Sequence, residues 1–96
     1  LPVFPGIERD LALVMDKDIE AQTVIDSIVR FSGKSLCSVK IFDVYTGKGV
    51  PDGKKSVAFR LTFRLPDKTM NDAEAEQAVS KILKKLKENC DIEIRS

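Results

Sequence analysis

The chain has 96 residues, of which 43% are apolar, and this length and composition fit one domain with one modest core. Its 16 basic and 15 acidic residues leave a net charge of +1, which argues against a freestanding, strongly basic nucleic-acid-binding protein. The chain has no histidine, and its two cysteines lack CxxC spacing, so the commonest general base, a zinc ribbon and a redox pair are excluded.

The amino end gives no indication of export or membrane insertion. The longest purely apolar run, residues 11–15, is far shorter than the ~20 residues that span a bilayer. The first residues do not follow the basic, apolar and small-residue order of a signal peptide. Because the chain also begins without methionine, we expect a single domain (residues 1–96, folded core about 4–95) excised from a longer chain.

The first predicted strand covers residues 9–16, after an irregular opening that contains Pro2, Pro5 and Gly6. Its alternation of apolar and polar residues is typical of a strand with one buried face. We expect Leu11, Leu13 and Met15 on the core side, and Asp10, Ala12, Val14 and Asp16 on the other side.

A helix is predicted to begin near Ile19, with Asp18 as its N-cap. Gly33 is expected to end it, because glycine commonly terminates helices. The apolar residues with helical spacing are Val24, Ile25, Ile28 and Val29.

The second predicted strand, residues 36–45, contains a conflict of side-chain direction. Val39 and Ile41 have the parity of the core, whereas Val44 shares the opposite parity with Phe42. A β-bulge at Ile41 and Phe42 resolves the conflict, because one extra residue lets two successive apolar side chains face inward.

The third predicted strand shows the clearest alternation in the chain. Its apolar residues are Val57, Phe59, Leu61, Phe63 and Leu65, alternating with Ser56, Ala58, Arg60, Thr62 and Arg64. Five apolar residues on one parity predict one buried face and one exposed face.

A second helix is predicted to begin with a capping box formed by Asn71 and Glu74. Its inner side carries Ala75, Ala78, Val79, Ile82, Leu83 and Leu86. The sequence DIEIR, residues 91–95, is predicted to close the chain as a short strand.

The resulting order, β-α-β-β-α-β, predicts an α+β fold, a ferredoxin-like two-layer sandwich. Right-handed crossovers place both helices on one face of a four-stranded antiparallel sheet with strand order 4-1-3-2. Cys37 begins the second strand and Cys90 leads into the fourth, and these edge strands are too far apart for a disulfide, so we expect free thiols and a reducing, cytoplasmic location.

The bulge and the hairpin together predict what the sheet face away from the helices presents. If the hairpin tip spans residues 46–55, Tyr45 pairs with Ser56 and Asp43 pairs with Ala58. The residues expected together on this face are Asp43, Tyr45, Ser56, Ala58 and Arg60, with Ala12 beside them and Lys48, Lys54 and Lys55 around them.

Two interpretations of this face remain open from the residues alone. Charged and hydroxyl side chains suit any solvated sheet face, and an acid on an edge strand discourages aggregation. Alternatively, the Asp43 carboxylate could accept two parallel hydrogen bonds from the Watson–Crick edge of an unpaired guanine, since unstacked bases are the usual targets of sequence-specific RNA recognition.

Three stretches of the chain carry a family resemblance: RDLALVMD, FDVYTGKGVPDGKKSVAFRLTFR and PDKTMNDAEAEQAV. Together they resemble the ferredoxin-fold anticodon-binding domain at the carboxyl end of the beta subunit of bacterial phenylalanyl-tRNA synthetase. The resemblance implies a non-catalytic appendage of a heterotetramer of two alpha and two beta subunits. That enzyme joins phenylalanine to tRNA(Phe) with ATP and Mg²⁺, while this domain needs neither cofactor nor metal.

The resemblance also implies partners and site residues. The domain would grip the anticodon stem-loop of tRNA(Phe), its open sheet face meeting the first anticodon base, a guanine. Asp43 of FDVY and Ser56 of GKKS match the family's contacts to that base, and Tyr45, Ala58 and Arg60 are their neighbours. Partners would be the rest of the beta subunit and the alpha subunit, with no membrane contact, and the isolated domain would be monomeric.

Arg9 of the matching RD pair could contact RNA or brace the first strand. The lysines near the end of the second helix are interpreted as a solvated face that complements the helix dipole: Lys81, Lys84, Lys85 and Lys87. The rival functions are a ferredoxin-like amino-acid-sensing regulatory module and a docking module. The glycines Gly47, Gly49 and Gly53 lie in a lysine-rich tip, which suits phosphate contact better than effector binding.

Overall fold

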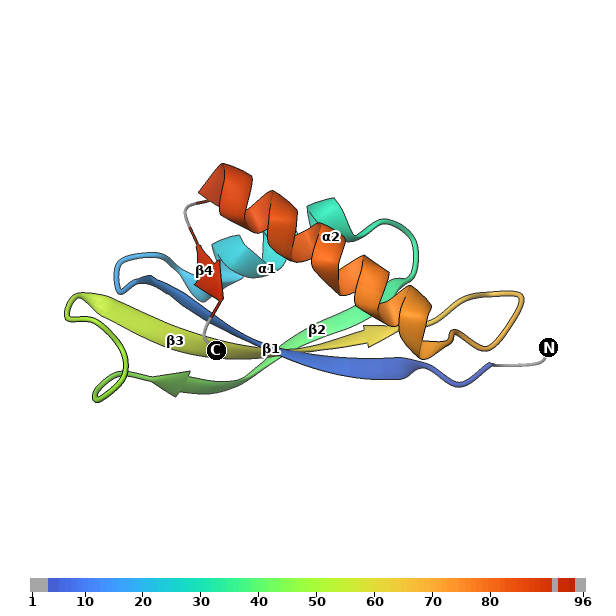
Figure 1. Cartoon of the computed structure of the whole chain (residues 1–96), viewed down its shortest axis with the longest axis horizontal. Helices are drawn as coiled ribbons and strands as arrows, with labels where there is room; N and C mark the ends of the chain where they lie inside the picture. Colours follow the sequence, from blue (N-terminus) through green and yellow to red (C-terminus); the bar gives the residue numbers. More distant parts are fainter. Residues whose placement is uncertain (1–3, 91, 95–96) are drawn as a thin grey trace.

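The computed structural model describes residues 4–90 and 92–94, which form two layers (Figure 1). The elements in chain order are β1 (Ile7–Asp16), α1 (Ala21–Ser32), β2 (Leu36–Tyr45), β3 (Lys54–Phe63), α2 (Asp72–Cys90) and β4 (Glu93–Ile94). Both helices lie on one face of an antiparallel sheet. The predicted α+β, ferredoxin-like arrangement is therefore confirmed.

Three long strands make up most of the sheet, with β3 paired to β2 on one side and to β1 on the other. The two-residue β4 pairs with the outer edge of β1, opposite Leu13 and Val14. Asp91 and Arg95 of the predicted strand 91–95 lie outside the described residues. The sheet thus rests on β1, β2 and β3, and its hairpin end extends past the helices (Figure 1).

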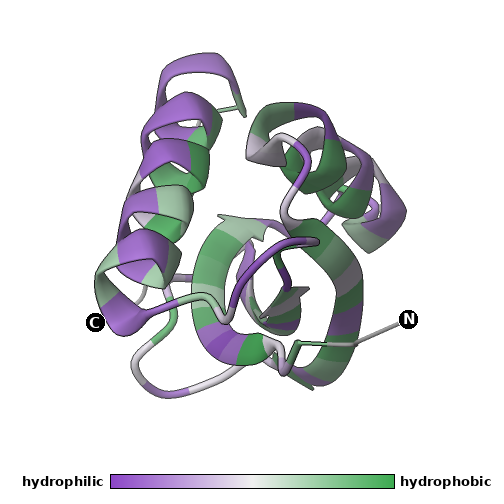
Figure 2. Cartoon of the chain, turned by 90° about the vertical axis from the view of Figure 1, so that its right-hand side faces the viewer, coloured by the Kyte–Doolittle hydropathy of each residue, from purple (hydrophilic) through white to green (hydrophobic). Residues whose placement is uncertain are grey.

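The core lies between the sheet and the helices (Figure 2). Four residues of β3, namely Val57, Phe59, Leu61 and Phe63, are 0% exposed, as their parity predicts. Leu13 and Met15 of β1 face the same side and are buried with them. Fully burying one such side chain contributes about 1.5–3 kcal/mol relative to leaving it exposed, so this face fixes the direction of every other residue in β3.

The predicted start of α1 is wrong. The helix begins at Ala21, and its N-cap residue is Glu20, which makes no side-chain capping hydrogen bond. Asp18 instead belongs to a turn after β1, in which the Ile19 amide donates to the Asp16 carbonyl at 3.1 Å. Because Asp18 lies in this turn, it does not act as the N-cap of the helix.

The two other predicted helix ends are confirmed. Gly33 ends α1 with a φ of 76°, a left-handed backbone that favours glycine. At the start of α2, the Glu74 amide donates to Asn71 Oδ1 at 2.8 Å, and the Asn71 amide donates to Glu74 Oε1 at 3.2 Å. These are the two reciprocal bonds of a capping box.

Cys37 and Cys90 are both free thiols, as predicted. Cys37 is the second residue of β2, whereas Cys90 is the last residue of α2. Cys90 lies against Ser27 of α1, with 3.9 Å between Sγ and Oγ. Each cysteine therefore has a different local environment.

Candidate nucleic-acid interface

The sheet face away from the helices, called the open face here, brings the predicted site residues together across β2, β3 and β1. Asp43 pairs with Ala58 and Tyr45 pairs with Ser56, both as predicted. Ala58 pairs in turn with Ala12 of β1. Asp43 and Tyr45 therefore stand at the edge of a floor made of small side chains.

A bulge in β2 delivers Asp43 to this face. The register shifts between Ile41 and Asp43, which leaves Phe42 as the extra residue, so the predicted bulge is confirmed. The expected inward direction of Phe42 is wrong. The residue is 49% exposed, and the Arg60 guanidinium carbon lies 4.7 Å from its ring centroid.

Phe42 is the site residue that sequence reasoning missed. Arg60 lies between two fully buried neighbours of β3, so alternation places Arg60, and with it Phe42, on the open face. The extra residue of the bulge thus shares the side of Asp43 rather than that of Ile41. A bulge in which the second apolar residue faces outward would have explained the same parity conflict.

Arg60 is tied into the sheet. Its Nε and Nη2 atoms donate to the two carboxylate oxygens of Asp10 on β1, at 2.9 and 3.2 Å. Glu8 Oε2 lies 3.8 Å from Arg60 Nε. The hydrogen bond from Arg60 lowers the pKa of the Asp10 carboxyl below its usual value. Two acids therefore offset the charge of Arg60, which leaves it less suited to bind a phosphate than its exposure alone indicates.

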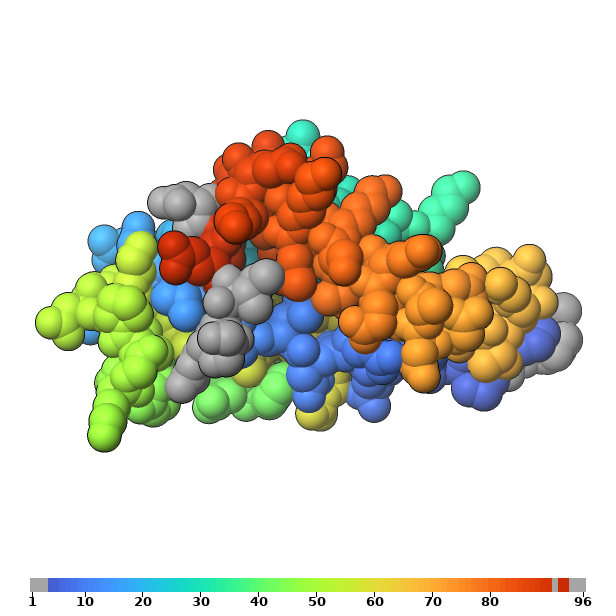
Figure 3. Space-filling view, in the orientation of Figure 1, coloured from blue at the N-terminus to red at the C-terminus, as the bar shows by residue number. Residues whose placement is uncertain are grey.

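Tyr45 anchors the start of the hairpin tip. Its hydroxyl donates to the Lys48 carbonyl at 2.8 Å. At Gly47, where φ is +136°, an added Cβ would lie 3.2 Å from the Tyr45 hydroxyl oxygen. The Val50 amide donates to the Gly47 carbonyl at 3.0 Å, and Val50 is buried. The tip is therefore a folded loop with its own contacts, and it projects past the helices (Figure 3).

The predicted site residues differ in accessibility. Asp43 and Arg60 are exposed, whereas Tyr45 and Ala58 are half-buried. Ser56 is only 3% exposed. A ligand on the open face could thus reach Asp43 directly, but contact with Ser56 would require neighbouring groups to move.

Of the three lysines predicted around the open face, Lys54 lies at this face as predicted, whereas the prediction for Lys55 is wrong. Lys54 Nζ lies 2.6 Å from Asp16 Oδ1. Lys55 Nζ donates to the Ile19 carbonyl at 2.6 Å, on the side of the helices. Both residues belong to β3 rather than to the tip, because the hairpin closes earlier than predicted. Lys48 remains exposed in the tip.

Arg9 braces the two layers. Its Nη2 atom lies 2.9 Å from Asp72 Oδ1, and its Nε lies 2.8 Å from Glu76 Oε1. Both acids are in α2, so Arg9 points toward the helices. The hydrogen bonds that Arg9 donates to Glu76 and Asp72 raise its pKa above the usual value. Of the two roles left open for Arg9, the structure supports the brace.

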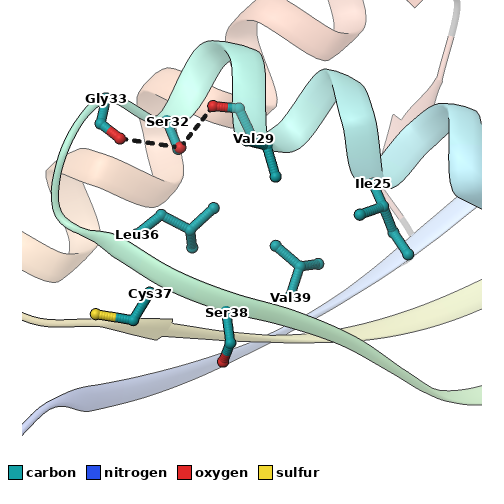
Figure 4. Close-up of a pocket in the computed structure, with 8 residues that line it drawn as sticks. All are labelled: Ile25, Val29, Ser32, Gly33, Leu36, Cys37, Ser38 and Val39. Atoms are coloured by element: carbon teal, nitrogen blue, oxygen red, sulfur yellow. Dashed lines mark hydrogen bonds between the residues drawn. The ribbon is translucent and has the colours of Figure 1, made fainter.

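A groove of about 370 Å³ lies between α1 and the start of β2, away from the open face (Figure 4). It is lined by Ile25, Val29, Ser32, Gly33, Leu36, Cys37, Ser38 and Val39. Val29, one of the four apolar residues with helical spacing, is 55% exposed at this groove. None of the lining side chains carries a formal charge, so no side chain of the groove can form an ion pair with either charged group of a free amino acid.

Within residues 4–90 and 92–94, no cluster of three or more histidine, cysteine, aspartate or glutamate side chains is arranged to hold a metal ion. Among the described helices, none is both long enough and apolar enough to cross a membrane.

Comparison with known proteins adds a family to this geometry. The sequence model of the ferredoxin-fold anticodon binding domain matches residues 2–95. The phenylalanine–tRNA ligase beta subunits of Clostridium tetani and Lactococcus lactis are each 42% identical to the chain over 95 residues, which cover 99% of the chain and 12% of the relative. The subunit of the same name from Aquifex aeolicus is 42% identical over 93 residues, covering 97% of the chain and 12% of that protein.

The chain therefore spans about an eighth of the length of the curated relatives that it matches. The family match extends over nearly all of the chain and agrees with the observed order of helices and strands. This chain belongs to the family of ferredoxin-fold anticodon-binding domains.

Proposed function

We propose that this chain binds the anticodon stem-loop of tRNA(Phe) as one domain of a longer phenylalanine–tRNA ligase beta subunit, and that Asp43 reads the first anticodon base, a guanine. The names of the relatives support the parent enzyme. In this proposal the domain is non-catalytic and the heterotetramer acts in the cytoplasm. ATP and Mg²⁺ bind outside this domain, in the rest of the alpha and beta subunits.

The observation that carries the proposal is the state of the Asp43 carboxylate. Other acids on the open face have cationic partners: Asp10 binds Arg60, and Asp16 binds Lys54. Within the described part of the chain, Asp43 forms no ion pair or side-chain hydrogen bond, although it is exposed. A carboxylate that served only to balance charge would be expected to pair in the same way.

The chemistry of guanine fits this carboxylate. The ring N–H and the exocyclic amine of guanine point in the same direction and can donate two parallel hydrogen bonds to one carboxylate. Adenine offers no such pair of donors on its Watson–Crick edge. Ala58 and Ala12, which share a cross-strand row with Asp43, leave room above the sheet for a flat base.

Tyr45 and Ser56 occupy the next row of this proposed site. Tyr45 would bound the base on the side of the hairpin tip, where its hydroxyl is held by the Lys48 carbonyl. Ser56 would contact the base after the groups that bury it move. Arg60 would act through Phe42 rather than through a phosphate, because its Nε and Nη2 atoms already donate to Asp10.

The test compares guanine-bearing and adenine-substituted anticodon stem-loops, titrated against the full-length ligase. The proposal predicts tighter binding of the guanine-bearing loop by wild type, and nearly equal binding of both by Asp43→Asn. Asp67→Asn is the matched control, because it removes the same charge from an exposed loop at the other end of β3. Equal binding of the two loops by wild type would contradict the proposal.

A further inference from the structure

Phe42 is an exposed aromatic ring on the face proposed to meet RNA. Two other phenylalanines, Phe59 and Phe63, are 0% exposed, whereas Phe42 is 49% exposed. Alternation from Ile41 places Phe42 on the open face, and the bulge then brings Asp43 to the same side. Large exposed aromatic side chains are typical of binding surfaces.

The Phe42 ring packs against a second flat group, the guanidinium of Arg60. The Arg60 guanidinium carbon lies 4.7 Å from the ring centroid, within the range of a cation–π contact. Asp10 fixes the guanidinium from β1 with two hydrogen bonds of 2.9 and 3.2 Å. The three side chains form a row across β2, β3 and β1. Such a pre-ordered platform loses little conformational entropy when a ligand binds.

The position of this platform limits what it can bind. Phe42 directly precedes Asp43, and Arg60 follows Ala58 by two residues in β3. Residues two apart in a strand are separated by roughly 6.6 Å, and neighbouring strands by about 4.8 Å. The platform therefore adjoins the base site on the side opposite Tyr45, within the reach of the next nucleotide in a single strand.

We propose that Phe42 and Arg60 form a stacking platform for the unpaired nucleobase next to the guanine that Asp43 reads. This inference rests on the proposed function. Unpaired bases commonly stack on aromatic rings and on the guanidinium planes of arginine. The platform binds without selecting a particular base, because every base has a π-face. Asp43 thus provides discrimination, whereas Phe42 and Arg60 provide affinity.

The test measures the affinity of the full-length ligase for anticodon stem-loops in which the neighbour of the guanine is either intact or abasic. Phe42→Leu keeps an apolar side chain but removes the ring, and we expect it to weaken binding of the intact loop at least about fivefold. The abasic loop should bind wild type and Phe42→Leu about equally. Salt dependence should stay unchanged, because no phosphate contact is removed.

Phe31→Leu is the matched control, because Phe31 also lies beneath an arginine, with the Arg30 guanidinium carbon 5.9 Å from its ring, but in α1. It should leave RNA affinity unchanged. Arg60→Lys, which keeps the charge and removes the plane, should weaken binding of the intact loop as Phe42→Leu does. Melting temperatures of all variants verify that they fold.

The outcomes separate this inference from the proposed function. If Phe42→Leu binds the intact loop as wild type does while Asp43→Asn still loses discrimination, the platform is refuted and the proposed function stands. A loss of affinity that is equal for intact and abasic loops also refutes the platform, since the ring then acts elsewhere. If neither Asp43→Asn nor Phe42→Leu changes RNA binding, the proposed function itself fails.

Discussion

The two faces of β3 differ in what holds their side chains. On the covered face, Val57, Phe59, Leu61 and Phe63 are fully buried against the helices. On the open face, Arg60 is held by an ion pair to β1 and a ring contact to β2, while Ala58 leaves space above the sheet. Packing thus determines the fold from one side of the strand and leaves the other side available for recognition.

The largest expected effect is on stability, and it differs between two phenylalanines on opposite faces of the sheet. Phe59→Ala should lower the free energy of unfolding by roughly 3–5 kcal/mol, because it leaves a cavity in the core. Phe42→Ala should lower it by less than about 1 kcal/mol, because its ring is half exposed and leaves no enclosed cavity. Chemical denaturation of both variants measures the difference. Equal losses would show that the two faces do not differ as described.

Two arginines sharpen the comparison further. Arg9 joins β1 to two acids of α2, whereas Arg60 joins β3 to acids of the neighbouring strand β1. Arg9→Gln should lower the melting temperature less than Phe59→Ala does, because its ion pairs are solvent-accessible, and it should leave anticodon affinity unchanged. Arg60→Gln should leave the melting temperature nearly unchanged and should weaken RNA binding. Loss of RNA binding in Arg9→Gln would contradict its assignment as a brace.

The smallest expected effect is a pH dependence in the helix layer. The hydrogen bond from Lys68 and then the Asn71 amide lower the pKa of Glu74 below its ordinary value of 4.5. Since the pKa of the folded state lies below that of the unfolded state, this carboxylate stabilises the fold above about pH 4.5, and the contribution is lost as the pH falls through the lowered pKa. Glu74→Gln keeps a capping amide but does not titrate.

Melting temperatures at about pH 6 and about pH 3 test this effect. The decrease between the two pH values should be smaller for Glu74→Gln than for wild type. Asp10→Asn provides the open-face counterpart, because the hydrogen bond from Arg60 lowers the pKa of Asp10 in the same direction. An unchanged pH dependence in Glu74→Gln would show that this carboxylate does not contribute to the stability of the helix layer.

The covered face could be predicted from the sequence because burial imposes a strict period on each strand. The parity of Phe59, the capping box at Asn71 and the pairing of Asp43 with Ala58 all follow from local pattern and hairpin geometry. The open face could be predicted only in part. No burial constrains Phe42 there, so its outward direction depends on how the bulge distributes two adjacent side chains.

The charge partners of the lysines at the hairpin end also could not be predicted from the sequence. Lys54 and Lys55 are adjacent in the chain, yet they have different partners on opposite sides of the sheet. Their roles depend on the strand register at the hairpin end, which turn residues alone leave uncertain by a few positions. The predicted N-cap of α1 is wrong for a similar reason, because the turn after β1 shifts the helix start beyond Asp18.

Recognition of guanine by Asp43 is tested most directly by a double-mutant cycle with the full-length ligase. The cycle combines Asp43→Ala with replacement of the guanosine at the first anticodon position by inosine. This replacement removes the exocyclic amine and keeps the ring N–H. Because one of two parallel hydrogen bonds depends on that amine, we predict a coupling free energy of about 1 kcal/mol or more, by analogy with bidentate base contacts in DNA. A coupling within error of zero would contradict the assignment of Asp43 as the residue that reads this base.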